Sequence, residues 1–176
     1  MNFEHSVETA LPIDTVFNTL RDDLGKLVEY LPNVKEIQQL ERHDSKGSVK
    51  LINKWYGKYQ IPLIVRKVLN ISEIAWLDRA EWLNNKYVCN WSIEPMILKD
   101  YVDAHGTNVY TSDGEQTIVK ITGDISIDIS NYSVVPHILK NKVNNEVSRI
   151  LLALIKPNFT KLVRGLEKYT KTHKLA

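Results

Sequence analysis

A long amphipathic helix is the clearest pattern in this chain, and it follows more than a hundred residues that read mainly as strands. From Pro136 to about His173, apolar residues recur every three or four positions and form one continuous stripe. Directly before it, residues 117–129 alternate between apolar and polar, which is typical of a strand with one buried face. Because the stripe needs an apolar partner, this order predicts a helix that covers a sheet.

The rest of the chain supplies the other strands of that sheet. Strands are expected at 2–9, 34–43, 48–56, 74–83, 87–95 and 102–111, and short helical stretches at 12–20 and 26–30. The segment 61–69 is apolar without a clear period and contains Pro62, so we expect a short helix or loop at the margin of the sheet. Runs of antiparallel strands closed by a helix predict an α+β fold.

Composition places the chain among ordinary soluble proteins. Of its 176 residues, 43% are hydrophobic and 25% are charged, and this size predicts a single domain over residues 1–176. No run approaches the ~20 apolar residues that a membrane span needs, so we expect a soluble, cytoplasmic protein. The single cysteine, Cys89, excludes an internal disulfide and agrees with a reducing compartment.

Charge is unevenly distributed along the chain. Residues 137–176 hold nine lysine and arginine residues but only two glutamates, whereas the preceding part is acidic overall. The favoured interpretation is a solvated helix face that docks on an acidic sheet body. The alternative is an interaction module that uses the basic helix for transient contact with a membrane or an acidic partner. Dense lysine and arginine clusters are missing, so nucleic acid is not an expected partner.

Three segments carry a resemblance to a known family. They are the opening strand that runs into Leu11–Phe17, the tryptophan pair of Trp76–Trp82, and Gly123–Asp128 ahead of the long helix. With these segments the chain resembles the START/Bet v 1-like (SRPBCC) superfamily. Its helix-grip fold curves an antiparallel sheet around a long C-terminal helix, with two short helices after the first strand. The superfamily includes lipid carriers, ubiquinone-binding proteins and polyketide cyclases, so the resemblance implies a cavity for a hydrophobic ligand more firmly than any reaction.

The predicted inner face of the sheet is apolar and aromatic with a few polar atoms, which is the composition of a small-molecule pocket and also that of an ordinary core. The candidate ligand-binding residues are His5, Trp55, Trp76, Asp78, Trp82, Cys89, Trp91, Asn108, Tyr110 and Ile121 from the strands, and Val143, Val147 and Leu151 from the long helix. Four tryptophans lie among the predicted strands, and together they favour a cavity more strongly than any single one of them does.

Strong catalytic signals are missing from the sequence. It contains no phosphate loop, no nucleophile elbow and no metal-ligand spacing of histidines, so we predict no catalytic residues, no metal and no cofactor. The favoured function is therefore the binding or transport of a hydrophobic small molecule or lipid. The alternative is an enzyme of the polyketide cyclase or dehydratase type, in which His5, Asp78 or Tyr110 moves a proton.

Overall fold

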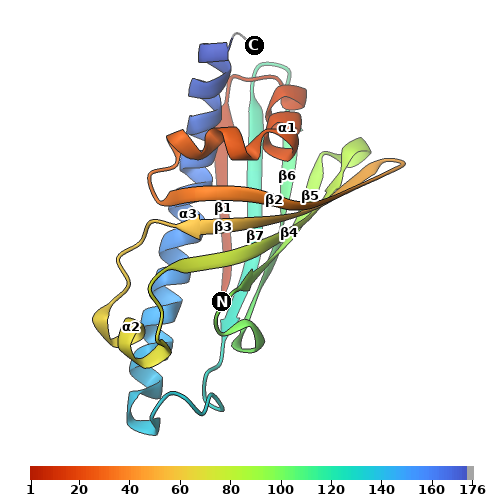
Figure 1. Cartoon of the computed structure of the whole chain (residues 1–176). Coiled ribbons are helices and arrows are strands. Elements are labelled where there is room, and N and C mark those ends of the chain that lie inside the picture. The colour runs from red at the N-terminus through yellow and green to blue at the C-terminus, as the bar shows by residue number, and fades with distance from the viewer. Residues whose placement is uncertain (174–176) are drawn as a thin grey trace.

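One antiparallel sheet of seven strands curves around the long C-terminal helix in the computed structural model of the chain (Figure 1). The structure describes residues 1–173, and for residues 151–157 it describes the backbone only. The strands are β1 (Asn2–Thr9), β2 (Val34–Ser45), β3 (Ser48–Gly57), β4 (Ile74–Leu83), β5 (Val88–Pro95), β6 (Val102–Ser112) and β7 (Thr117–Ile127). The α-helices are α1 (Ile13–Asp22), α2 (Leu63–Leu69) and α3 (Lys140–His173). The 3-10 helices are η1 (Leu24–Tyr30), η2 (Asn84–Lys86), η3 (Lys99–Tyr101) and η4 (His137–Leu139).

Sheet topology follows chain order except at β1. The strand order is β1-β7-β6-β5-β4-β3-β2, so the first strand closes against the last one. Most neighbours are joined by short turns, as in the β2–β3 hairpin, where Gly47 adopts a positive φ of 88° that favours glycine. This arrangement confirms the predicted α+β helix-grip fold, in which the short helices α1 and η1 follow β1 and the sheet wraps α3.

Alternation along the strands produces the buried face. In β7 the side chains of Val119, Ile121 and Ile125 are buried, and in β3 those of Val49 and Leu51 are buried. The polar residues between them point to the outer face, as the period of two requires.

The end of β7 differs from the prediction. The strand stops at Ile127, whereas the apolar alternation continues to Ile129. The Asp128 carboxylate accepts a hydrogen bond of 2.8 Å from the backbone N–H of Ser130, which turns the chain at this point. Ile129 is buried all the same, at 1% exposure, but in the loop that leads to α3.

Helix α3 runs along the concave side of the sheet, while α1 and η1 lie across its C-terminal half and α2 lies beside its N-terminal half (Figure 1). Gly165 allows η1 to approach closely, because a Cβ at this position would lie 2.7 Å from Cβ of Tyr30. The helix is continuous through Pro157.

Charges on α3 are partly paired along the helix itself. Arg149 contacts Glu146 and Arg164 contacts Glu167, each three residues apart and at the surface. Exposed pairs of this kind contribute little stability. No helix in the described part of the chain is long and apolar enough to cross a membrane.

Candidate ligand-binding cavity

A cavity of about 170 Å³ lies between the curved sheet, the α1–η1 region and the C-terminal half of α3. The lining residues are Leu20, Leu24 and Leu31 from the short helices and the segment after them; Trp55, Ile74, Ala75, Trp76, Asp78, Ala80, Trp82, Cys89, Trp91, Ile93, Pro95, Asn108, Tyr110 and Ile121 from the strands; and Asn158, Phe159 and Leu162 from α3. Most of them are apolar or aromatic, as in pockets that bind small molecules.

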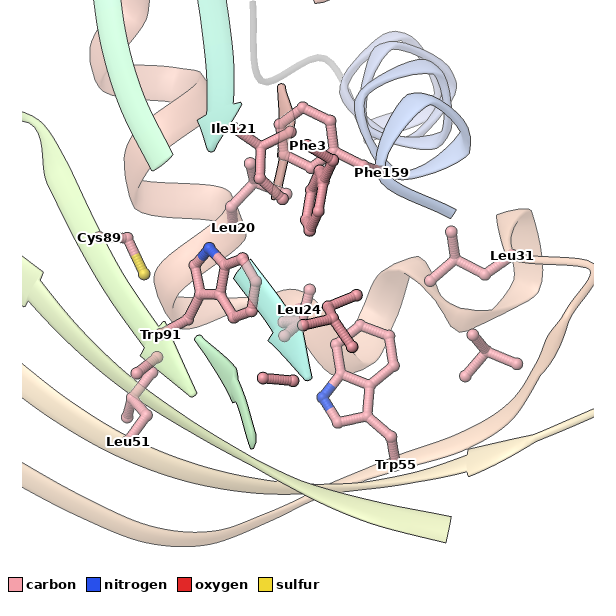
Figure 2. Packing of buried hydrophobic residues seen from close by; sticks show 14 of the residues in the cluster. Phe3, Leu20, Leu24, Leu31, Leu51, Trp55, Cys89, Trp91, Ile121 and Phe159 are labelled. Atoms are coloured by element: carbon pink, nitrogen blue, oxygen red, sulfur yellow. The ribbon is translucent and has the colours of Figure 1, made fainter. Parts of the chain in front are cut away.

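The strand register gathers the indole rings. Trp55 on β3 pairs directly with Trp76 on β4, and their rings stack with centroids 5.7 Å apart and planes at 18°. On the next strand Trp91 pairs with Ala80, a small residue that leaves room above the sheet. Figure 2 shows Trp55 and Trp91 pointing into the same interior space, with Phe159 entering from α3. The cavity is therefore lined by large rigid rings from three neighbouring strands.

Two glycines allow Trp91 to lie flat across the sheet. A Cβ at Gly106 would lie 2.4 Å from Cζ2 of Trp91, and a Cβ at Gly123 would lie 2.8 Å from its Cη2. The indole N–H of Trp91 donates a hydrogen bond of 3.0 Å to Oδ1 of Asn108 on β6. The position of the Trp91 ring is therefore determined both by the two glycines, which have no side chain, and by the hydrogen bond to Asn108.

Asp78 brings a carboxyl group into this apolar surrounding. It lies at an inward position of β4 between Asn53 on β3 and Ile93 on β5, and it lines the cavity. Burial raises the pKa of the carboxyl to about 6, while the neighbouring Trp55 and Asn53 side chains act in the opposite direction. No lysine, arginine or histidine in the described part of the chain forms an ion pair with it.

Two further ionisable groups of the cavity are neutral near pH 7. Burial raises the pKa of the Cys89 thiol, and the nearby Asp78 carboxyl adds to the effect. Burial, and then the Cys89 sulfur, raises the pKa of the Tyr110 phenol. Neither group is therefore an activated nucleophile or a general base.

Several polar atoms of the lining have no hydrogen-bond partner. Among the described residues these are the indole N–H group of Trp82 and the side-chain oxygen of Asn158. The indole N–H of Trp55 also lacks a hydrogen bond of normal geometry, but it lies close enough to the Asp78 carboxyl to lower the pKa of that group. Buried polar atoms are normally paired, so unpaired ones around a cavity indicate places where a ligand would bind. Within the same part of the chain, no three His, Cys, Asp or Glu side chains gather in a way that could hold a metal ion.

Several solved structures have a fold similar to that of this chain. No family model and no curated protein sequence matches the chain. A crystal structure from Thermus thermophilus aligns with 98% of this chain and 99% of its own, at 17% identity and a TM-score of 0.66. The Zhui aromatase/cyclase of a Streptomyces species aligns over 97% of this chain and 93% of its own, at 15% identity and a TM-score of 0.67.

A third solved structure is also similar to this chain. A point mutant of norcoclaurine synthase from Thalictrum aligns over 99% of this chain and 96% of its own, at 13% identity and a TM-score of 0.61. The chain has the Bet v 1-like fold. At these identities the likeness concerns the fold, which agrees with the resemblance found in the sequence.

Within this Bet v 1-like fold, nine of the thirteen predicted ligand-binding residues line the cavity. They are Trp55, Trp76, Asp78, Trp82, Cys89, Trp91, Asn108, Tyr110 and Ile121. All come from strands whose alternation identifies the inner face. Their role in binding stays a prediction.

His5 also lies on the inner face of the Bet v 1-like sheet but outside the cavity lining. Its Nε2 forms a hydrogen bond of 2.7 Å with the hydroxyl of Thr160, and its ring meets that of Phe159 edge to face. The ring thus joins β1 to α3. The hydrogen-bond partner of His5 is therefore a side-chain hydroxyl on the helix that covers the sheet.

Two of the helix residues predicted for the cavity, Val143 and Val147, lie at other places along α3. Val143 is fully buried but does not line the cavity, and Val147 lines a second, adjoining cavity of about 270 Å³. This second cavity shares Ile74, Ala75 and Pro95 with the first and is lined on one side by Val65 and Leu69 of α2. The side chain of Leu151 lies outside the described residues.

Among the described side chains of α3, those that line the main cavity are instead Asn158, Phe159 and Leu162, more than two turns further along the helix than Val147. The apolar stripe includes Phe159 and Leu162, but a stripe does not tell which of its turns faces which strand. Leu20 and Leu24 were likewise missed as lining residues, since their apolar periodicity indicates only a buried helix face.

Proposed function

We propose that this protein binds a hydrophobic small molecule in the cavity between the sheet and α3. The observation that carries the proposal is the lining itself: four indole rings and a set of aliphatic side chains surround a space that the protein does not fill. Protein interiors are otherwise packed about as densely as organic crystals. A fold that leaves such a space in its core gives up contacts that a ligand can restore.

The energetics favour a small, largely apolar ligand. Each Å² of apolar ligand surface removed from water contributes roughly 25 cal/mol, so about 300 Å² gives on the order of 7 kcal/mol before the cost of association. The few polar atoms of the lining set the ligand's orientation. A lipid is the other member of this ligand class, and the adjoining cavity beneath α2 is where a longer apolar chain would extend.

A fluorescent apolar probe tests this proposal. We expect N-phenyl-1-naphthylamine, which is uncharged at pH 7, to bind with a micromolar Kd and to be displaced by other apolar molecules. Replacing Ala80 with phenylalanine places a ring in the cavity and should weaken probe binding at least tenfold. The measurement is a fluorescence titration, with the unfolding temperature of each variant checked in parallel.

The matched control is Arg79→Phe, which adds the same ring to the outer face of the same strand and removes only an exposed ion pair with Glu94. It should bind the probe as the wild-type protein does. Binding that is equal in all three proteins would place the probe on the surface and contradict the proposal.

A second candidate function rests on Asp78. A carboxyl with a pKa of about 6 inside a cavity is able to accept and return a proton near neutral pH. Of the three residues considered for cyclase or dehydratase chemistry, Asp78 and Tyr110 line the cavity and His5 does not. Recovery of a bound compound that is chemically changed by the wild-type protein but not by an Asp78→Asn variant would favour this function over simple binding.

A further inference from the structure

Asp78 is the one formally charged residue in the described lining of the cavity. The carboxyl has no cationic partner among the described residues, and burial of an uncompensated charge is costly. At pH 7.5 it is nevertheless mostly ionised, since its pKa is about 6. The cavity therefore carries a negative charge that nothing in the described protein neutralises.

The register surrounds this carboxyl with aromatic rings. Trp76 is two residues away on the same strand and face, and Trp55 pairs with Trp76 from β3. On the other side Trp91 lies diagonally across β5, two residues before Ile93, the residue that pairs with Asp78. The faces of indole rings attract cations more strongly than those of any other side chain.

The lining holds a second acceptor, and this one lacks a donor. The side-chain oxygen of Asn158 on α3 is buried and unpaired. An ammonium group offers three N–H donors and no acceptor, which suits both a carboxylate without a cationic partner and an unpaired amide oxygen. The unpaired N–H of Trp82 has the opposite need, and a ligand oxygen would satisfy it.

We propose that the ligand of this cavity is an apolar molecule that carries a protonated amine, with the ammonium group bound against Asp78 among Trp55, Trp76 and Trp91. This inference rests on the proposed function, because it names the ligand class of the same cavity. In such a ligand the apolar body supplies most of the affinity, and the ammonium group supplies the selectivity.

Three probes with one apolar body test the proposal by isothermal titration calorimetry at pH 7.5. They are 2-(1-naphthyl)ethylamine, 2-(1-naphthyl)ethanol and 1-naphthylacetate. We expect the amine to bind at least tenfold more tightly than the alcohol, and the carboxylate to bind most weakly because it meets the charge of Asp78.

Variants assign the selectivity to the carboxyl. Asp78→Asn, which keeps the shape of the side chain, should bring the affinity for the amine to within about threefold of that for the alcohol and leave the alcohol's own affinity nearly unchanged. Glu94→Gln removes a carboxylate from the outer face of the neighbouring strand and should leave the amine preference intact. If Asp78→Asn folds poorly, Asp78→Leu serves as a second replacement, and it should likewise lose the preference for the amine.

The outcomes separate this inference from the proposed function. If the alcohol binds as well as the amine in the wild-type protein, or if Asp78→Asn keeps the preference, the inference is overturned and the cavity still binds apolar molecules. If none of the three probes binds and N-phenyl-1-naphthylamine does not bind either, both the inference and the proposed function are overturned.

Discussion

Replacing Gly106 with alanine is expected to lower the free energy of unfolding by about 3 kcal/mol, at the upper end of the usual cost of overpacking. A Cβ at this position would lie 2.1 Å from the backbone oxygen of Thr122 on the paired strand and 2.4 Å from the Trp91 ring. The first of these atoms is backbone in the middle of the β6–β7 ladder, so it cannot move without breaking the register. Urea denaturation measures the change.

Gly25→Ala is the matched control for this prediction. A Cβ there would meet nothing closer than the backbone oxygen of Ile37, at 3.6 Å, and Gly25 has no positive φ. Its free energy of unfolding should change by less than 1 kcal/mol. If Gly106→Ala unfolds at the same urea concentration as the control, Trp91 and the sheet have more room than the structure gives them.

Asp78→Asn is expected to stabilise the protein, and to do so more as the pH rises. The folded-state pKa of about 6 lies above the ordinary value of 3.8, so the folded protein holds the proton more tightly than the unfolded chain. The contribution of Asp78 to stability is therefore greatest below pH 3.8, declines as the pH rises through 6, and then stays low. The difference between the two pKa values corresponds to about 3 kcal/mol.

Asparagine does not titrate, so the stability difference between the variant and the wild-type protein isolates this carboxyl. That difference should grow by about 2 kcal/mol in favour of the variant between pH 4.5 and pH 8, as measured by urea denaturation at each pH. Glu94→Gln, on the outer face of β5, serves as the control and should show no comparable growth. A difference that stays constant with pH would mean that Asp78 is well solvated.

The Asp78→Asn variant connects stability to the proposed ligand. A carboxyl that costs stability in the empty protein is a feature that stabilising substitutions would readily remove, and functional sites are where such costs are found. Binding of a cation at Asp78 would offset the cost. The stability of the ligand-free protein and its ligand selectivity thus both depend on the charge of the Asp78 carboxylate.

Periodicity was sufficient to predict the architecture and most of the cavity wall. Alternation in β3, β4 and β5 identifies which side chains point inward, and this alone places Trp55, Trp76 and Trp91 on one face. The stripe along α3 then implies that the face is covered. These inferences succeed because they depend on local geometry, which repeats every two or 3.6 residues.

Contacts between segments that lie far apart in the sequence could not be predicted in the same way. Which turns of α3 face the cavity depends on how the sheet curves and on where α1 and η1 cross the helix, so Val143 was assigned to the wall that Asn158 and Phe159 occupy. The partner of His5 lies 155 residues away in sequence, on α3. The raised pKa of Asp78 likewise depends on burial by several strands together, which no single segment reveals.

Whether the cavity is a ligand site is best tested by native mass spectrometry of protein purified from its own host. We expect a bound apolar molecule that can be extracted, that carries an amine, and that is lost from the Ala80→Phe variant but retained by Arg79→Phe. A wild-type protein that is repeatedly recovered without any bound molecule, and that binds none of the apolar probes, would contradict this expectation.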